Sequence, residues 1–243
     1  IVTGHYAGTR TGESGVALVR ARDRFKDQTY FLARLDQEQL KRAFFPLADL
    51  KKSEVREVAA RALLPTAARK DSQGLCFLGK ISFFDFLAAR LGKRPGPFIE
   101  EETGLIVGEH QGYWFYTVGQ RRGLSLSGGP WYVTRRDALQ NQIFISRDYF
   151  SADKPRNRFR ATELCWNLDE PSLDLRSSGE LQVKLRHGEQ EYRCRFIEED
   201  GESESSVAVE IDGHDQGIAP GQFAVFYHDD VCLGSAVISL QAP

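Results

Sequence analysis

The chain has 243 residues, of which 41% are hydrophobic and 27% are charged, and its formal net charge at pH 7 is -2. This composition is typical of a globular protein and excludes collagen-like, coiled-coil and wholly disordered classes. No apolar run approaches the roughly 18 residues that a membrane-spanning helix needs, so we expect no membrane partner. The chain begins at Ile1 and contains no methionine, which indicates a fragment or a processed chain of one to three domains.

The first part of the chain mixes strands and helices. Residues 1–7 and 16–20 are typical of two short strands joined by a glycine-rich turn. Residues 27–91 are expected to be helical, because apolar side chains in KKSEVREVAARALL repeat at helical spacing. In ISFFDFLAARLG, Ser82 and Asp85 form a capping pattern, and Gly92 is expected to follow the end of a helix.

Short strands dominate the rest of the chain. PFIEEETGLIVGEH predicts a hairpin that turns at Thr103 and Gly104, and WYVTRRDALQNQIFISRD predicts another that turns over residues 139–141. From Arg158 onward, six short strands without a helix predict a small closed barrel or a sandwich. We therefore place domain boundaries near residues 93 and 157.

Charge is distributed unevenly along the chain. Residues 20–70 carry 13 Lys and Arg against 7 Asp and Glu, whereas residues 196–218 carry 8 acidic residues and no Lys or Arg. A basic region of this kind favours a polyanionic partner such as a nucleic acid. The alternative is a solvated helical surface.

The four cysteines are far apart and form no CxxC pair, which argues against a disulfide framework and a zinc site. Cys165, Cys194 and Cys232 are interpreted as reduced, mostly buried thiols of an intracellular protein. Cys76 differs, because Lys70 and Lys80 flank it and a helix is expected to start just after it. Such a setting lowers a thiol pKa and suits a nucleophile or a sulfur carrier, although it also fits an inert loop cysteine.

Other short motifs are individually weak. Gly4 and His5 follow a strand-like run, and in KDQ a lysine suits phosphate while a glutamine can read a base edge. The alternative for KDQ is a helix start with Asp27 as its cap. In GEHQGYWFYTVGQRRGL, aromatic side chains beside Arg121 and Arg122 suit either base stacking or a buried strand. KLRHGEQ and PGQ add further polar residues at strand ends. The sequence contains no P-loop, SGG-type loop or metal-ligand cluster.

Several segments taken together resemble the tRNA-specific 2-thiouridylase family, also called tRNA-uridine 2-sulfurtransferases. They occur in the order TGHYA, KDQTYFL, FPLADLKKSEVREVA, DSQGLCFLGK, GEHQGYWFYTVGQRRGL, GPWYV and PGQFAVFY, and span the whole chain. The resemblance implies the helical end of an α/β, adenine-nucleotide α-hydrolase-like domain over residues 1–92. A small central α+β domain is expected over 93–157, and an all-β barrel that docks tRNA over 158–243.

The resemblance also implies an activity. Family members use ATP and Mg²⁺ to adenylate the C2 oxygen of the wobble uridine of tRNA, and a cysteine persulfide then delivers sulfur to that carbon. The expected partners are tRNA and a persulfide sulfur donor, either a cysteine desulfurase or a sulfur-relay protein. The location is expected to be the cytoplasm in a bacterium, or the mitochondrion or chloroplast in a eukaryote.

Site residues follow by matching motifs. Cys76 matches the cysteine that holds the persulfide, and Gly4 matches a glycine at the ATP site. The residues matching family contacts to tRNA are His5, Lys26, Asp27, Gln28, Arg186, His187 and Gln222. At the position of His187 the family often has a tyrosine.

The chain departs from the family pattern in one respect. The SGGxDS pyrophosphate loop and the first catalytic cysteine, which attacks the persulfide or forms the sulfur-releasing disulfide, are expected upstream of Ile1. Residues 1–243 alone are therefore predicted to be inactive, with most of the ATP and Mg²⁺ site missing. Two alternatives remain: a non-catalytic RNA-binding module with an incidental cysteine, and a thiol-based relay protein without RNA.

Overall fold

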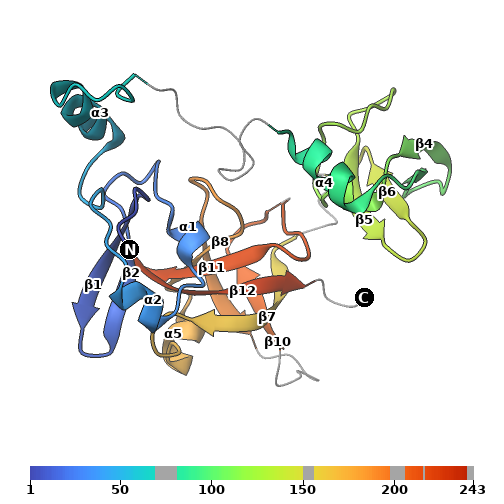
Figure 1. Cartoon of the computed structure of the whole chain (residues 1–243). Coiled ribbons are helices and arrows are strands. Elements are labelled where there is room, and N and C mark those ends of the chain that lie inside the picture. The colour runs from blue at the N-terminus through green and yellow to red at the C-terminus, as the bar shows by residue number, and fades with distance from the viewer. Residues whose placement is uncertain (69–80, 150–155, 198–205, 216, 240–243) are drawn as a thin grey trace. The chain divides into compact units, whose positions relative to one another are not determined.

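The computed structural model describes residues 1–68, 81–149, 156–197, 206–215 and 217–239. Contacts divide the chain into two compact units, one formed by Ile1–Ala68 with Arg156–Pro243 and the other by Arg69–Pro155 (Figure 1). The predicted sulfur carrier, Cys76, lies outside the described residues.

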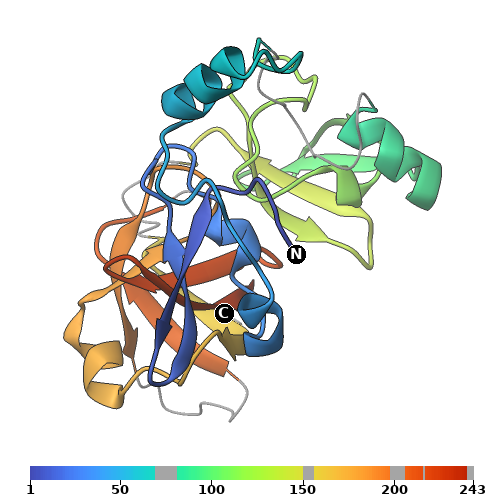
Figure 2. The same cartoon turned by 60° about the vertical axis from the view of Figure 1, so that its left-hand side comes forward.

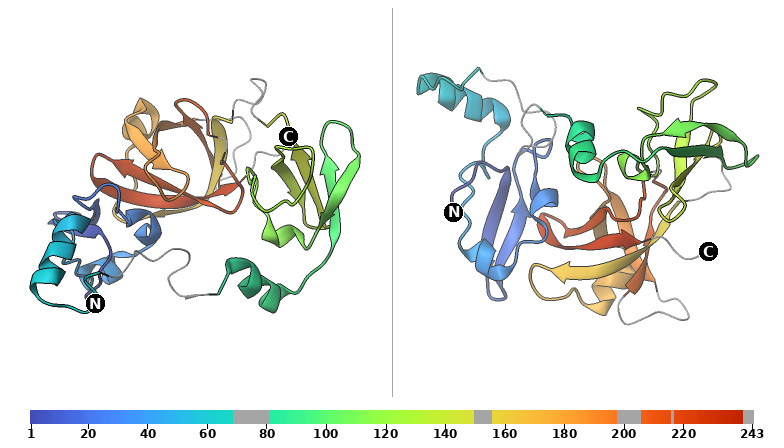
Figure 3. Two further views of the ribbon diagram at one scale, coloured as in Figure 1. Left: turned by 90° about the horizontal axis from the view of Figure 1, so that it is seen from above. Right: turned by 45° about the vertical axis from the view of Figure 1, so that its right-hand side comes forward.

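The C-terminal part of the first unit is a closed barrel of six antiparallel strands. The strands run in the order β12-β11-β8-β9-β10-β7, and β7 also pairs with β12, which closes the ring (Figure 3). Their bounds are β7 Arg158–Trp166, β8 Leu181–Lys184, β9 Tyr192–Ile197, β10 Ser206–Ile211, β11 Phe223–His228 and β12 Val231–Ser239. Alternate side chains fill the barrel, among them Phe159, Val183, Val209, Phe226 and Ile238. The six predicted strands and the barrel are confirmed; the short helix α5, Leu173–Ser178, was not predicted.

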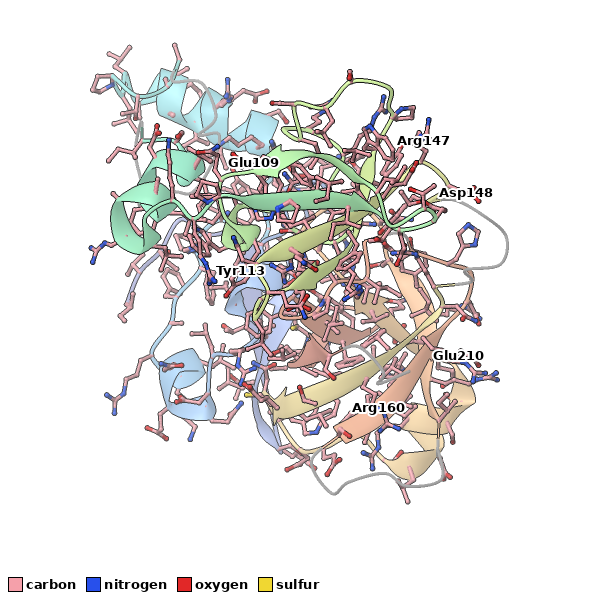
Figure 4. The ribbon with its side chains drawn as sticks, turned by 90° about the vertical axis from the view of Figure 1, so that its right-hand side faces the viewer. Glu109, Tyr113, Arg147, Asp148, Arg160 and Glu210 are labelled. Carbon is pink, nitrogen blue, oxygen red and sulfur yellow. The ribbon has the colours of Figure 1, made fainter. Side chains whose placement is uncertain are left out.

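The outer face of the barrel carries an arginine–glutamate row across three strands. Glu210 on β10 accepts hydrogen bonds from Arg158 on β7, at 2.6 Å, and from Arg195 Nε on β9, at 2.8 Å. These two guanidinium groups hold the pKa of Glu210 below its ordinary value. Figure 4 shows Glu210 and the neighbouring Arg160 on this face.

An N-terminal hairpin extends the barrel sheet. It consists of β1, Ala7–Gly12, and β2, Gly15–Arg20, and β2 pairs with β12 through Val19 opposite Val231 (Figure 2). The prediction of a strand over residues 1–7 was wrong in position. Pairing with β2 begins at Ala7, opposite Arg20, whereas the preceding segment forms only an isolated bridge from Val2 to Phe44.

Three short helices follow the hairpin within the region predicted to be helical: α1, Thr29–Leu32, α2, Gln37–Lys41, and α3, Lys52–Arg61. The hairpin and α2 pack on the outer face of β11 and β12. Leu18, Leu40, Tyr227 and Cys232 are buried in this contact. Each large apolar side chain buried in this way stabilises the fold by about 1.5–3 kcal/mol. Residues 1–68 and the outer face of the barrel therefore share a hydrophobic cluster that is separate from the barrel interior.

In its described residues, the second unit is a four-stranded sheet with one α-helix and a short 3-10 turn. Its strands, β3 Gly96–Glu100, β4 Ile106–His110, β5 Tyr132–Asp137 and β6 Gln142–Ser146, lie in the order β4-β3-β6-β5. Both predicted hairpins are confirmed. At the end of β6, Arg147 (labelled in Figure 4) donates a 2.7 Å hydrogen bond to Glu100. A hydrogen bond from the Thr103 hydroxyl and this bond from Arg147 lower the pKa of Glu100.

Helix α4, Phe83–Leu91, begins as its sequence predicts. The Ser82 hydroxyl accepts a hydrogen bond from the Asp85 backbone at 3.1 Å, and the helix ends at Gly92, with φ +73°. Phe84 stacks on Phe115 with 4.3 Å between ring centroids, so α4 packs on the 3-10 turn Tyr113–Phe115 of the second unit. The unit boundaries by contact accordingly fall at residues 69 and 156, whereas the sequence placed them after residues 92 and 157.

Candidate nucleic-acid interface

Three segments that are distant in sequence meet around α1 in the first unit. The Tyr30 hydroxyl of α1 donates a 3.0 Å hydrogen bond to the backbone oxygen of Phe223 at the start of β11. The ring of Phe31 lies 4.6 Å from the imidazole of His187 in the loop between β8 and β9. Figure 1 shows α1 beside β8 and β11. The predicted RNA contacts at residues 26–28, 186–187 and 222 therefore lie on segments around one short helix.

Asp27 has a structural role beside α1. It is buried, and its carboxylate accepts hydrogen bonds from the Ala21 backbone at 3.0 Å and the Thr29 hydroxyl at 2.6 Å. Thr29 in turn lies 3.1 Å from the Tyr227 hydroxyl of β11. The alternative prediction that Asp27 caps the helix was wrong, because the N-cap is Gln28. Asp27 instead fixes the turn between β2 and α1.

Gln28 joins this turn to the segment that contains Gly4 and His5. Its side-chain oxygen accepts a 3.0 Å hydrogen bond from the Tyr6 backbone nitrogen, and its own backbone nitrogen donates to the Tyr6 oxygen at 2.8 Å. His5 is half-buried, and its Nδ1 lies 2.7 Å from the Thr3 hydroxyl. The structure thus brings His5 and residues 26–28 together.

Arg186 and His187 follow β8 and are exposed. The Arg186 guanidinium binds both oxygens of the buried Asp215, at 2.7 and 2.6 Å. Burial lowers the pKa of His187, and the charge of the neighbouring Lys184 lowers it further. The imidazole is therefore neutral near pH 7.

Gln222 lies in the turn before β11. Its backbone oxygen accepts a 2.7 Å hydrogen bond from Ile238, and the preceding Gly221 has a φ of +82°, which favours glycine. This geometry holds the half-buried Gln222 at the barrel rim, next to the Phe223 that Tyr30 contacts.

A cavity of about 450 Å³ lies on the same unit, and sequence reasoning missed its residues. Arg20 contributes a guanidinium that lies 4.0 Å from the centroid of the Tyr227 ring and donates to Glu191 at 2.6 Å. The remaining lining residues are Arg24, Phe25, Gln182, Lys184, Glu189, Asp229 and Asp230. Lys184 is buried with a lowered pKa, chiefly through burial, and donates to the Gly188 oxygen at 3.0 Å. The only sequence signal was a lysine inside the apolar strand LQVKL.

Comparison with known proteins places the chain in a family. Three family models match it in succession: the tRNA methyl transferase HUP domain over residues 1–80, the tRNA methyl transferase PRC-barrel domain over 84–147 and the aminomethyltransferase beta-barrel domain over 156–238. The tRNA-specific 2-thiouridylase MnmA 1 of Bacteroides thetaiotaomicron is 44% identical over 239 residues, which cover 98% of this chain and 66% of the relative. The tRNA-specific 2-thiouridylase MnmA of Porphyromonas gingivalis strain ATCC 33277 is 42% identical over a match 249 residues long, gaps included. The match covers 98% of this chain and 67% of the relative. The chain belongs to the tRNA-specific 2-thiouridylase MnmA family.

This chain of the MnmA family spans about two thirds of the length of these relatives. The matches agree with the predicted layout of a HUP-domain fragment, a central domain and a C-terminal β-barrel. The relative from Parabacteroides distasonis, 43% identical over 240 residues, gives the same coverage of 98% of this chain and 66% of its own length.

The aromatic motif GEHQGYWFYTVGQRRGL packs mainly into the core of the second unit. Tyr116 is buried there, and Phe115 stacks on α4. His110 is fully buried, accepts a 3.0 Å hydrogen bond from the Gly112 backbone, and has a pKa that burial lowers. Tyr113, labelled in Figure 4, lies in a single 3-10 turn. These residues favour the structural reading of the motif over base stacking.

The three described cysteines, Cys165, Cys194 and Cys232, are free thiols, as the sequence predicted. Burial raises the pKa of Cys194, and it raises the pKa of Cys232 to about 12. Among the described residues, no cluster of three or more His, Cys, Asp and Glu is placed to hold a metal ion. Within the same residues, no helix is both long and apolar enough to span a membrane.

Proposed function

We propose that this chain is the tRNA-docking and persulfide-bearing part of an ATP-dependent tRNA 2-thiouridylase. The convergence of His5, residues 26–28, Arg186 and His187 around α1 carries this proposal, because residues selected as RNA contacts from separate motifs lie on one unit. The MnmA relatives, 42–44% identical over nearly the whole chain, support tRNA as the substrate.

In the proposed reaction, the outer sulfur of a Cys76 persulfide attacks C2 of the wobble uridine. The bond from C2 to its adenylated oxygen breaks, and AMP leaves. A second cysteine thiolate, which the family resemblance implies, takes the inner sulfur of Cys76 into a disulfide as the S–S bond of the persulfide breaks. A cysteine desulfurase or a sulfur-relay protein would supply the persulfide, and a thiol reductant would reset the disulfide.

The residues of this chain would contribute little to nucleotide binding. Gly4 is exposed, and a side chain built there would meet only Leu47, at 3.9 Å, so its backbone is open to a nucleotide. ATP, when bound, would supply the adenylate that turns the uridine oxygen into a leaving group. The described residues would instead bind and orient tRNA, and we propose that Mg²⁺ is held outside them.

The test is a thiolation assay with a chain that also carries the SGGxDS segment and first cysteine of the family. The protein is incubated with tRNA, ATP, Mg²⁺ and a persulfide donor, and digested tRNA is examined for 2-thiouridine by mass spectrometry. Wild type and the control Cys165→Ser should form 2-thiouridine, and Cys76→Ser should form none while binding tRNA normally. Equal product from Cys76→Ser would remove Cys76 from the reaction.

Two further outcomes would contradict the proposal. Bound tRNA without 2-thiouridine from any variant would indicate an RNA-binding module, and thiol transfer without a tRNA complex would indicate a relay protein. Residues 1–243 alone should bind tRNA but form no 2-thiouridine. Detectable product from this chain alone would show that it holds a complete site.

We propose cytoplasmic, mitochondrial or chloroplast tRNA as the substrate pool, according to the source.

A further inference from the structure

Helix α1 presents an exposed aromatic ring against an imidazole. Phe31 is 59% exposed, although its ring centroid lies 4.6 Å from that of His187, with an interplanar angle of 35°. A large apolar residue in such a position is not needed for the core, which uses the neighbouring Tyr30 and Leu32 instead. The ring of Phe31 therefore leaves an aromatic face open to solvent beside the imidazole.

The surrounding contacts fix this pair in place. Tyr30 donates its hydroxyl to the Phe223 backbone at 3.0 Å, and burial raises the pKa of Tyr30 to about 12, so that it remains a donor at neutral pH. On the other side, Lys184 binds the oxygen of Gly188 and thereby closes the loop that carries His187. Two anchored segments thus hold the rings of Phe31 and His187 together.

The charges around the pair select the partner. Arg186 precedes His187 in the same loop, and Lys26 lies in the segment that leads into α1. Arg34, just after α1, places its guanidinium 5.3 Å from the ring centroid of Phe223, which is 39% exposed. Cations beside exposed aromatic faces are the arrangement that binds single-stranded nucleic acid, because backbone phosphates meet the cations while bases stack on the rings. An apolar peptide would supply no phosphate for these cations, and a lipid surface would supply no base for the exposed rings to stack on.

We propose that Phe31 and His187 form a stacking platform for one unpaired base of the bound RNA. The proposal rests on the proposed function, since it assumes that this face docks tRNA. Stacking uses the π face that every base has, so the platform positions the strand without reading its sequence. The rings that stack on RNA are then Phe31 and His187, rather than those of GEHQGYWFYTVGQRRGL, for which the sequence left base stacking and a buried strand both open.

The test measures binding of an RNA anticodon stem-loop that carries the fluorescent base 2-aminopurine at successive loop positions. Phe31→Leu keeps an apolar side chain but removes the π face, and should weaken binding about 5- to 160-fold. It should also abolish the fluorescence quenching that wild type causes at one loop position. Phe31→Tyr and His187→Tyr keep a ring and should bind as wild type does. The matched control is Phe44→Leu, because Phe44 is 61% exposed on the same unit but has no ring contact among the described residues.

The outcomes distinguish failure of the stacking platform from failure of the proposed tRNA docking. Loss of binding by Phe31→Leu and His187→Leu, with the double variant no worse than the stronger single variant, supports one shared platform. Wild-type affinity and quenching in Phe31→Leu would overturn the platform while leaving tRNA docking intact. Equal losses from Phe44→Leu would also overturn it. If wild type itself binds no stem-loop and no tRNA, the proposed function fails together with the platform. Circular dichroism melting of each variant identifies a loss that comes from unfolding, and in that case the ring-retaining Tyr variants decide.

Discussion

The carboxylate of Asp215 holds the guanidinium of Arg186 by both of its oxygens, at 2.7 and 2.6 Å. The Asp215 side chain is 1% exposed and that of Arg186 is 44% exposed. The backbone of Gly217 also donates to Asp215, at 2.5 Å. A predicted RNA contact is therefore oriented by a buried acid that the sequence comparison did not select.

Because Asp215 binds the Arg186 guanidinium with both oxygens, we predict that tRNA binding depends on the shape of this side chain as well as on its charge. Arg186→Ala should reduce the slope of log affinity for tRNA against log salt concentration by about 1, as expected for the loss of one phosphate contact. Arg186→Lys should also weaken binding, because an ammonium group cannot make the two-oxygen contact with Asp215. Filter binding from low to moderate salt measures both variants, with Arg193→Ala on β9 as the control. An unchanged slope for Arg186→Ala would exclude a phosphate contact.

Gln28 allows the structural and RNA-binding roles to be separated. Gln28→Ala removes the acceptor for the Tyr6 backbone and should lower the free energy of unfolding by about 1 kcal/mol. Gln28→Glu keeps an acceptor oxygen, so we expect stability near that of wild type but weaker tRNA binding, because the amide donors are lost and a negative charge is added. Urea unfolding and tRNA affinity are measured on both variants. Wild-type affinity in Gln28→Glu would assign Gln28 a purely structural role.

The thiols should differ in reactivity. The raised pKa values of the buried Cys194 and Cys232 leave almost no thiolate at pH 7.5, so brief iodoacetamide treatment should modify neither. Cys76 is predicted from its flanking lysines to react first, and the half-buried Cys165 more slowly. Peptide mass spectrometry gives the order, and the same treatment in urea should modify all four. Labelling of Cys194 as fast as Cys76 would contradict this order.

His110 makes the second unit sensitive to acid. Burial lowers its pKa below the ordinary value of 6.5, so the unfolded chain binds a proton more readily than the folded chain. Stability is therefore retained above about pH 6.5 and falls as the pH is lowered from there toward the folded-state pKa, by at most about 1.4 kcal/mol per pH unit. Hydrogen exchange of β3 and β4 peptides in the intact chain at pH 7.5 and 5.5 measures this fall. His110→Phe, which keeps a ring beside Phe98, should remove the His110 contribution, and an unchanged pH response would contradict its role.

Local signals in the sequence identified much of the fold. Alternating apolar residues gave all six barrel strands, and the Ser82 cap and the turn at Gly104 were readable because each depends on neighbouring residues. The strand expected over residues 1–7 was misplaced because pairing with β2, not local apolar content, determines where β1 starts.

The interface was predictable only as separate motifs. Nothing near Asp27 in the sequence indicates that its carboxylate binds Ala21, and nothing near Arg186 indicates Asp215, because these contacts depend on how the barrel and residues 1–68 pack. The pairing of Phe31 with His187 depends on the same long-range packing, which places α1 beside the loop after β8. Motif matching selected Arg186 and His187, but it could not reveal their neighbours.

The pairing of Val19 with Val231 means that the sheet cannot be completed until the end of the chain has been synthesised. These partners are more than 200 residues apart, and the whole second unit is synthesised between them. During translation, β2 emerges from the ribosome long before β12. Until β12 is made, the edge of the hairpin formed by β2 has no partner strand. Unpaired strand edges are where chains associate wrongly, and contacts between distant residues form slowly. Newly made chains therefore depend on rapid completion of β12, and truncation before it would expose both the hairpin edge and the open barrel.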